Sequence, residues 1–229
     1  MTRQDAVNVL LVLVGSALVK ITLDGTDLRY VKPASAPLVL TAGIVIIALA
    51  ITAMVRAITD PAPHDHPGAR WCWLLVLPVL TIFLVAPPAL GADTVLRDAR
   101  ATRIAPPSEA FAPLPSGIVP MAVSEFIARS VWDPTHALNT RTVELTGFVV
   151  HTAGTDYVAR LVITCCAADA TPMTVALTGH LAADLANDQW ITVTGRLRPG
   201  SATAADGYTP TLLVTALHTV DAPADPYEH

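Results

Sequence analysis

The chain has 229 residues, of which 52% are hydrophobic and only 14% charged, and its formal net charge is −5. A soluble domain is usually about a quarter charged, so this composition excludes an entirely water-soluble protein and predicts a part that lies in lipid. The apolar residues gather before Leu90, whereas the sequence after Ala122 alternates as globular domains do. We therefore expect one membrane region and one domain of modest size.

Three apolar runs, at about residues 7–23, 36–58 and 71–90, precede the globular part. A helix needs about 20 apolar residues to cross a hydrocarbon core of about 30 Å. The first run is short, but Lys20 near its end can reach the headgroups. A cleaved signal peptide is the alternative for this run, but it lacks a small-residue cleavage site and two further runs follow. We predict three transmembrane helices within residues 1–92, and so a multi-pass protein of the cell membrane in contact with the lipid bilayer.

Three spans place the two ends of the chain on opposite sides of the bilayer. Lysines and arginines are more numerous on the side of the C-terminal domain, which favours a cytoplasmic domain by the positive-inside rule. Long domains, however, cross largely regardless of charge, and the short N-terminal tail with Arg3 is typical of a cytoplasmic start. We expect the C-terminal domain on the extracytoplasmic side.

The connection between the second and third runs, TDPAPHDHPGAR, contains three possible metal ligands, His64, Asp65 and His66. Imidazole and carboxylate groups bind divalent ions, but two imidazoles and one carboxylate would hold an ion weakly without further ligands. The alternative, which we favour, is a polar turn between two helices.

After the third run, residues 93–122 are rich in proline and show no apolar periodicity, which predicts an extended linker. VSEFIARSVW, residues 123–132, places Val123, Phe126, Ile127 and Val131 on one stripe. This spacing predicts a short amphipathic helix.

The hydrophobic period then changes to two, which predicts β-strands. We expect five strands and, between the third and fourth, a short helix at 180–188; the strands are expected at 141–150, 157–166, 172–179, 189–199 and 211–220. The first and fourth strands share an apolar-x-apolar-Thr-Gly pattern, VELTGFV and ITVTGRL. A glycine inside a strand marks a bulge or a tight bend at a barrel corner.

This order favours an OB-like five-stranded β-barrel over residues 123–221, in which the first and fourth strands are neighbours. An open β-sandwich is the alternative, and residues 222–229 are expected to form a C-terminal tail. From Val123 onward, five arginines stand against eleven carboxylates. The domain therefore lacks the basic face of nucleic-acid binders, and we expect no nucleic-acid partner.

Cys165 and Cys166 stand side by side at the end of the second predicted strand, followed by Asp169 and His180. Three interpretations stay open: small side chains that fill a corner of the barrel, thiol redox exchange, and a metal site made of Cys165, Cys166, Asp169 and His180. Thiolate, imidazole and carboxylate suit zinc, and a soft cysteine pair suits copper(I). The spacing differs from the CxxC pattern of zinc fingers, so no cofactor is certain.

Several short motifs give the chain a resemblance to a known family: DLRYVKP, the HDH loop, FLVAPPALG, ITCCAADA and DPYE. On these motifs, over nearly its full length, the chain resembles the YcgQ-like family of permease subunits, which are uncharacterised bacterial membrane proteins encoded beside a larger multi-span permease. The resemblance implies partnership with that permease. Other members carry a richer histidine loop, which links them to zinc or another divalent cation, whereas this sequence keeps only His64 and His66 around Asp65.

The sequence contains no Ser-His-Asp set, phosphate-binding glycine loop or catalytic carboxylate pair at recognisable spacing, so we do not expect an enzyme. We expect an accessory membrane subunit of a two-component permease, whose β domain serves recognition or assembly and takes part in divalent metal handling. The alternative is a metal-binding or metal-delivery protein of the cell envelope that acts through Cys165 and Cys166.

Overall fold

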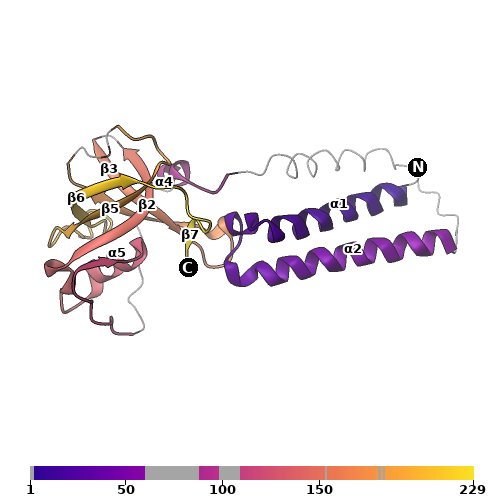
Figure 1. Ribbon diagram of the computed structural model, residues 1–229, viewed down its shortest axis with the longest axis horizontal. Helices are drawn as coiled ribbons and strands as arrows, with labels where there is room; N and C mark the ends of the chain where they lie inside the picture. Colours follow the sequence, from indigo (N-terminus) through magenta and orange to yellow (C-terminus); the bar gives the residue numbers. More distant parts are fainter. Residues whose placement is uncertain (1–2, 60–87, 98–108, 153, 180–181, 183) are drawn as a thin grey trace. The chain divides into compact units, whose positions relative to one another are not determined.

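The computed structural model describes residues 3–59, 88–97, 109–152, 154–179, 182 and 184–229. The chain divides into two units, Met1–Ala89 and Leu90–His229, which Figure 1 shows as a helical part and a β-rich part. The expected third span lies outside the described residues except for residues 88–90, and the expected ligands His64, Asp65 and His66 lie outside them entirely.

In its described residues the first unit contains two α-helices joined by a short connection. Helix α1 covers Arg3–Leu23 and helix α2 covers Ala36–Thr59, with two 3-10 turns between them, η1 (Thr26–Arg29) and η2 (Pro33–Ser35). Gly25 permits the turn, because its φ of 69° lies in the left-handed region that side chains disfavour. Pro33 starts η2 at a position where its missing N–H costs nothing.

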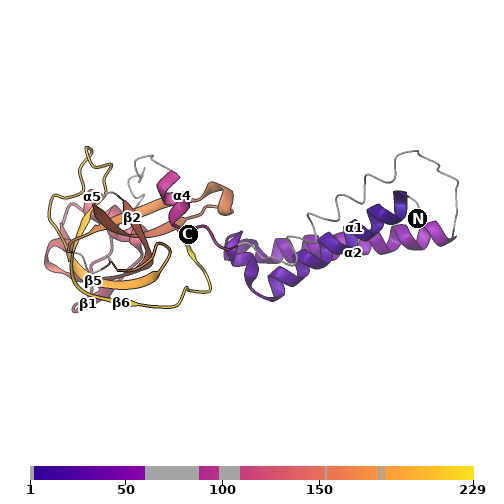
Figure 2. The ribbon, with the colours of Figure 1, turned by 90° about the horizontal axis from the view of Figure 1, so that it is seen from above.

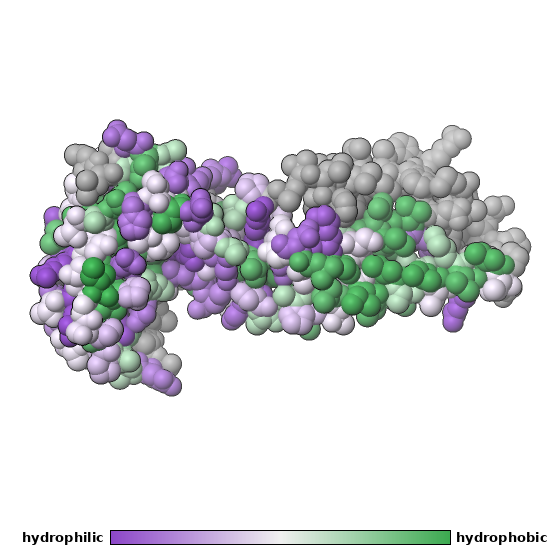
Figure 3. Space-filling model, in the orientation of Figure 1, coloured by the Kyte–Doolittle hydropathy of each residue, from purple (hydrophilic) through white to green (hydrophobic). Residues whose placement is uncertain are grey.

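Among the described residues, one helix is long and apolar enough to cross a membrane, Pro33–Arg56. The expectation of three spans is therefore not confirmed, since the described part of the chain contains one candidate span. The apolar part of α1, Val7–Leu23, is too short by this measure. At 1.5 Å per residue its 17 residues extend about 25 Å, which is less than the thickness of a hydrocarbon core, about 30 Å. Hydrophobic residues, green in Figure 3, lie along much of the described part of these helices that this view shows.

Helices α1 and α2 approach each other through Gly15 and Gly43. A Cβ atom on Gly15 would lie 2.9 Å from the carbonyl oxygen of Gly43, and a Cβ atom on Gly43 would lie 3.0 Å from the carbonyl oxygen of Gly15. Small residues that let two backbones come this close are typical of helix contacts in membranes. Any larger side chain at either position would push the helices apart.

The second unit consists of seven strands and two helices in its described residues. In chain order these are α4 (Ala92–Arg97), β1 (Ile118–Pro120), α5 (Val123–Trp132), β2 (Thr142–Thr152), β3 (Thr155–Val162), β4 (Thr171–Leu177), β5 (Trp190–Leu197), β6 (Thr211–Thr219) and β7 (Tyr227–Glu228). The expected linker 93–122 thus contains α4 and β1, and the expected tail 222–229 contains β7.

Five of the strands close into a ring, seen from a second direction in Figure 2. Strand β2 pairs antiparallel with both β3 and β5, β3 pairs with β4, β5 pairs with β6, and β4 and β6 pair in parallel. The prediction that the first and fourth strands of the domain are neighbours is confirmed by the β2–β5 pair. Strands β1 and β7 add to β2 and β3, each in parallel.

Helix α5 covers the residues that the sequence predicted, 123–132, and packs on the ring. Val123, Phe126 and Ile127 are fully buried in the same core as Leu145, Val175 and other residues of the ring strands. The helix expected at 180–188 is absent from the described residues of that segment, which form turns. The helix that contributes to the core therefore precedes the ring instead of lying between its third and fourth strands.

The two strand glycines lie where neighbouring backbones come very close. Phe148, next to Gly147, pairs with Trp190 of β5 on one side and with Ala159 of β3 on the other, and a Cβ atom on Gly147 would lie 2.4 Å from the Ala159 carbonyl oxygen. A Cβ atom on Gly195, beside the bulge in the β5–β6 pair, would lie 2.5 Å from the Leu213 carbonyl oxygen. The expected bulge is confirmed at Gly195, whereas Gly147 permits a close approach of β2 to β3 within a regular register.

Replacing Gly147 with alanine should destabilise the ring, because the added methyl group meets a backbone oxygen that cannot rotate away. We expect Gly147→Ala to lower the free energy of unfolding by about 1–3 kcal/mol, measured by urea denaturation of the full-length protein in detergent. Ala216→Val is the matched control, since it adds atoms at an exposed position of β6. Equal stability of the two variants would contradict the close approach of β2 and β3.

Candidate metal centre

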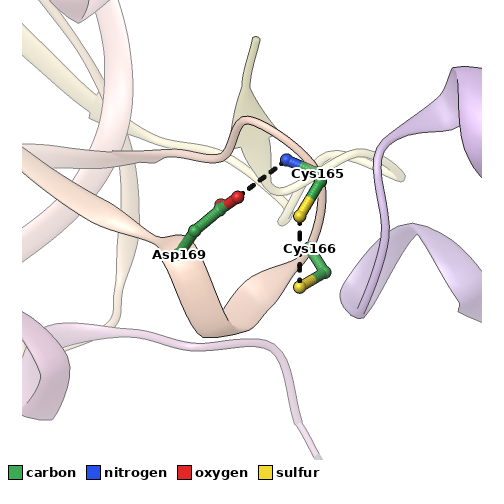
Figure 4. A group of neighbouring side chains, drawn as sticks. All are labelled: Cys165, Cys166 and Asp169. Carbon is green, nitrogen blue, oxygen red and sulfur yellow. Dashed lines mark hydrogen bonds between the residues drawn. The ribbon is translucent and has the colours of Figure 1, made fainter.

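Three side chains with metal-ligating atoms gather on the loop that follows β3. The two sulfur atoms of Cys165 and Cys166 and a carboxylate oxygen of Asp169 all lie within 4.8 Å of one another, and Figure 4 shows the three side chains on one short turn. The Cys165 thiol donates a hydrogen bond to the Cys166 sulfur at 3.6 Å. Three of the four residues predicted for this site are thus together, and the fourth, His180, lies outside the described residues.

The loop is closed by the carboxylate of Asp169. Its Oδ1 accepts a hydrogen bond from the backbone N–H of Thr164 at 2.9 Å, and its Oδ2 accepts one from the backbone N–H of Cys165, also at 2.9 Å. The backbone N–H of Asp169 donates back to the Cys166 carbonyl at 3.0 Å, where the 3-10 turn η5 (Ala167–Asp169) begins. Hydrogen bonds to a carboxylate are about twice as strong as neutral ones, so Asp169 fixes the backbone that carries both cysteines.

Both cysteines lie beyond the end of β3 and outside the core of the ring. Strand β3 ends at Val162, so the strand alternation that would send one cysteine inward no longer applies. Cys165 is exposed and Cys166 is half-buried. The interpretation that both cysteine side chains pack into a corner of the barrel is therefore wrong for Cys165.

The surroundings of Cys165 favour the neutral thiol. The hydrogen bond to Asp169 and, after it, the contact with Cys166 raise the pKa of Cys165 to about 11. The same Cys165 hydrogen bond, together with the Thr164 N–H, lowers the pKa of Asp169 below its usual 3.8. Because the thiolate is the reactive form, Cys165 is a poor nucleophile near neutral pH, which disfavours thiol exchange as its role.

The base of the loop is held by β7. Ile163, which directly precedes the loop, donates its N–H to the Glu228 carbonyl at 3.0 Å. The Glu228 carboxylate in turn accepts the backbone N–H groups of Val123 at 2.8 Å and Ser124 at 2.9 Å, at the start of α5. An acidic group at a helix N-terminus satisfies unpaired N–H donors and complements the helix dipole. We call this arrangement the Glu228 clamp.

A buried arginine completes the Glu228 clamp. Arg160 is only 9% exposed; its Nε lies 3.6 Å from Glu228 Oε1, and its Nη2 donates to the Tyr227 carbonyl at 3.0 Å. The guanidinium also lies 4.9 Å from the centre of the Trp190 ring, a cation–π distance. The clamp was not predicted from the sequence, although its DPYE segment was noted as a motif.

His151 of β2 has both ring nitrogens engaged and offers no free ligand atom. Its Nδ1 lies 2.8 Å from Asp156 Oδ1 and its Nε2 lies 2.7 Å from the Leu185 carbonyl. The Asp156 hydrogen bond and the Leu185 carbonyl raise the pKa of His151. His151 lines a pocket of about 350 Å³, but both ring nitrogens are already engaged.

Removing the negative charge beside Cys165 should make this thiol more reactive. In Asp169→Asn the pKa of Cys165 falls towards its ordinary value, so more thiolate is present at pH 8, while each thiolate becomes a weaker nucleophile. We expect the alkylation rate of Cys165 by iodoacetamide to rise roughly tenfold, measured by peptide mass spectrometry. Asp206→Asn, at an exposed carboxylate on another loop, should leave the rate unchanged. A slower or equal rate in Asp169→Asn would disprove the role assigned to the carboxylate.

Loss of the Glu228 carboxylate should loosen both α5 and the base of the cysteine loop. Glu228→Ala leaves two helix N–H groups without their acceptor and removes the carboxylate that forms an ion pair with the buried Arg160. We expect a loss of about 2–4 kcal/mol in unfolding free energy, and faster amide hydrogen exchange at Ile163 and Ser124. Asp221→Asn, at an exposed carboxylate nearby in the sequence, is the control, and unchanged exchange in Glu228→Ala would count against the clamp.

A comparison with protein families gives a match over the C-terminal part of the chain. Residues 129–229 match the DUF1980 C-terminal domain family. No curated protein and no solved structure matches the chain. The matched region runs from within α5 to β7 and so includes the ring, the cysteine loop and Glu228, and it fits the resemblance to an uncharacterised, permease-associated family.

Proposed function

We propose that this protein is an accessory membrane subunit of a larger multi-span permease. In this proposal α1, α2 and the apolar run 71–90 lie in the bilayer beside the partner, and the ring of β2–β6 lies on the extracytoplasmic side, where it serves recognition or assembly. The observation that carries the proposal is the contrast between α2, whose apolar side chains are exposed, and a second unit with a core of its own.

The exposed apolar side chains of α2 distinguish it from a core helix of a soluble protein. Only 11% of its most apolar stretch is buried. Its large exposed residues are Leu38, Ile44, Val45, Leu49, Ile51, Met54, Val55 and Ile58. Such a surface is stable against lipid tails or against other membrane helices, and unstable in water.

The same helices support an accessory role over independent transport. The close approach at Gly15 and Gly43 brings the two backbones together, so the hairpin has no room for a solute between its helices at that point. Charged residues within membranes mark ion and solute pathways, and the sequence of α2 contains a single charged residue, Arg56, near its end. A transport pathway is therefore better assigned to the partner.

The pairing of the five ring strands supports an OB-like barrel over an open sandwich. In our proposal β2, β3, β4, β5 and β6 are the five strands of the barrel, closed by the parallel β4–β6 pair and the antiparallel β2–β3 pair. OB-like barrels use a sheet face and the loops around it for recognition. Since the domain is acidic, that recognition would be of a protein partner and not of a nucleic acid.

The proposal is tested by co-expression with a multi-span permease of the kind that the resemblance implies as its partner. We expect the protein to stay in the membrane fraction after alkaline carbonate washing and to co-purify with the permease in mild detergent. Gly43→Leu should reduce the recovered permease several-fold, because the side chain would force α2 away from α1, while the variant remains in the membrane.

Ile44→Leu is the matched control, since Ile44 is the next residue on α2 and is 55% exposed. It should recover as much permease as the unaltered protein. Recovery of the unaltered protein in the aqueous fraction, or from membranes without the permease, would refute the proposed function.

A further inference from the structure

We propose that Cys165, Cys166 and Asp169 form a three-ligand site for a thiophilic divalent cation of the zinc class. The site lies on the loop between β3 and β4, and its fourth position is open to water or to a donor from another protein. This inference goes beyond the role as a permease subunit and does not depend on it.

The distance between the two sulfur atoms fits tetrahedral zinc. With Zn–S bonds of about 2.3 Å and tetrahedral angles, two thiolates on one ion lie about 3.8 Å apart. The sulfur atoms of Cys165 and Cys166 lie 3.6 Å apart. An ion can therefore bind both sulfurs with a shift of only a few tenths of an ångström, and no strand or helix has to move.

The carboxylate of Asp169 has the capacity for an additional bond. A carboxylate oxygen has two lone-pair sites, and each oxygen of Asp169 accepts one backbone N–H, from Thr164 or from Cys165. The Cys165 side chain also hydrogen-bonds to Asp169, but that bond is lost when the thiol gives up its proton to bind an ion, so lone pairs on the carboxylate become available to the ion. The backbone donors would act as the outer hydrogen bonds that orient a metal-binding carboxylate and are common around metal sites.

The ligand set selects the class of ion. Two thiolates exclude the hard ions Mg²⁺ and Ca²⁺, which take oxygen ligands. A linear two-thiolate ion such as copper(I) would place the sulfur atoms about two bond lengths apart, about 4.6 Å at the Zn–S bond length, which is 1 Å more than this loop provides. Zinc fits the spacing and also accepts the carboxylate oxygen.

The exposure of the site indicates an exchangeable ion. Structural zinc sites have four protein ligands, whereas three ligands with an open position are typical of sites where the ion reacts or exchanges. Cys165 and Asp169 are exposed and Cys166 is half-buried, so a donor from another protein can reach the fourth position. The site is thus suited to take up and release its ion.

The test uses the full-length protein in detergent, reduced with a phosphine, freed of metal with a chelator, and titrated with Zn²⁺ against a chromophoric competitor. We expect one Zn²⁺ per chain. Cys165→Ser/Cys166→Ser should abolish this binding, and Asp169→Asn should weaken it by about 10–100-fold. Titration with Co²⁺ should give a thiolate-to-metal charge-transfer band that the double variant lacks.

Cys72→Ser is the matched control, because it removes the third cysteine of the chain and should keep both the stoichiometry and the Co²⁺ band. The midpoint temperature of thermal unfolding should be the same for the metal-free double variant and the metal-free unaltered protein. This comparison distinguishes a loss of metal binding from a loss of folding. Zinc binding that is absent, or equal in the double variant, would overturn the inference, as would a Co²⁺ adduct without the thiolate band. Such results would leave co-purification with the permease unaffected, so the two proposals can fail separately.

Discussion

A single carboxylate, that of Glu228, connects the parts of the β-rich unit that the chain itself keeps far apart. It accepts the first N–H groups of α5, more than a hundred residues earlier in the sequence, and lies beside the buried Arg160 of β3. Its own backbone carbonyl holds Ile163, where the cysteine loop begins. A buried guanidinium without an anion nearby would be costly, so helix, strand and loop all depend on the presence of this acidic residue.

The ring could largely be predicted from the sequence because its signals are local. The period of two located all five ring strands, and the shared Thr-Gly pattern of β2 and β5 identified two strands that do pair. The helix expected at 180–188 did not appear in its described residues, whereas the helix expected from the apolar stripe at 123–132 is α5. A regular apolar period identifies the face of a helix or strand that must be buried, which is why it locates such elements well.

The candidate site was predictable for a different reason, since Cys165, Cys166 and Asp169 are separated by at most four residues. What the sequence could not give is the way the carboxylate folds back to the backbone of the loop, or the distance between the sulfur atoms. The Glu228 clamp joins residues 104 and 105 positions apart, and no local pattern reports such a contact. In the first unit, composition predicted apolar helices but not the contact between Gly15 and Gly43.

The ring also has one join that is much weaker than the others. Strands β4 and β6 pair through only two residue positions, Ala176 with Thr211 and Leu177 with Leu212. Beyond them Thr178 continues the join: its backbone N–H donates to the Leu212 carbonyl at 3.0 Å, and its hydroxyl donates to the same carbonyl and accepts the Val214 N–H, each at 3.1 Å. We expect local opening of the barrel to start along this line, because it has the fewest paired positions of the five joins. Solvent should therefore reach the core first between β4 and β6, while the longer pairings of β2 and β5 remain intact.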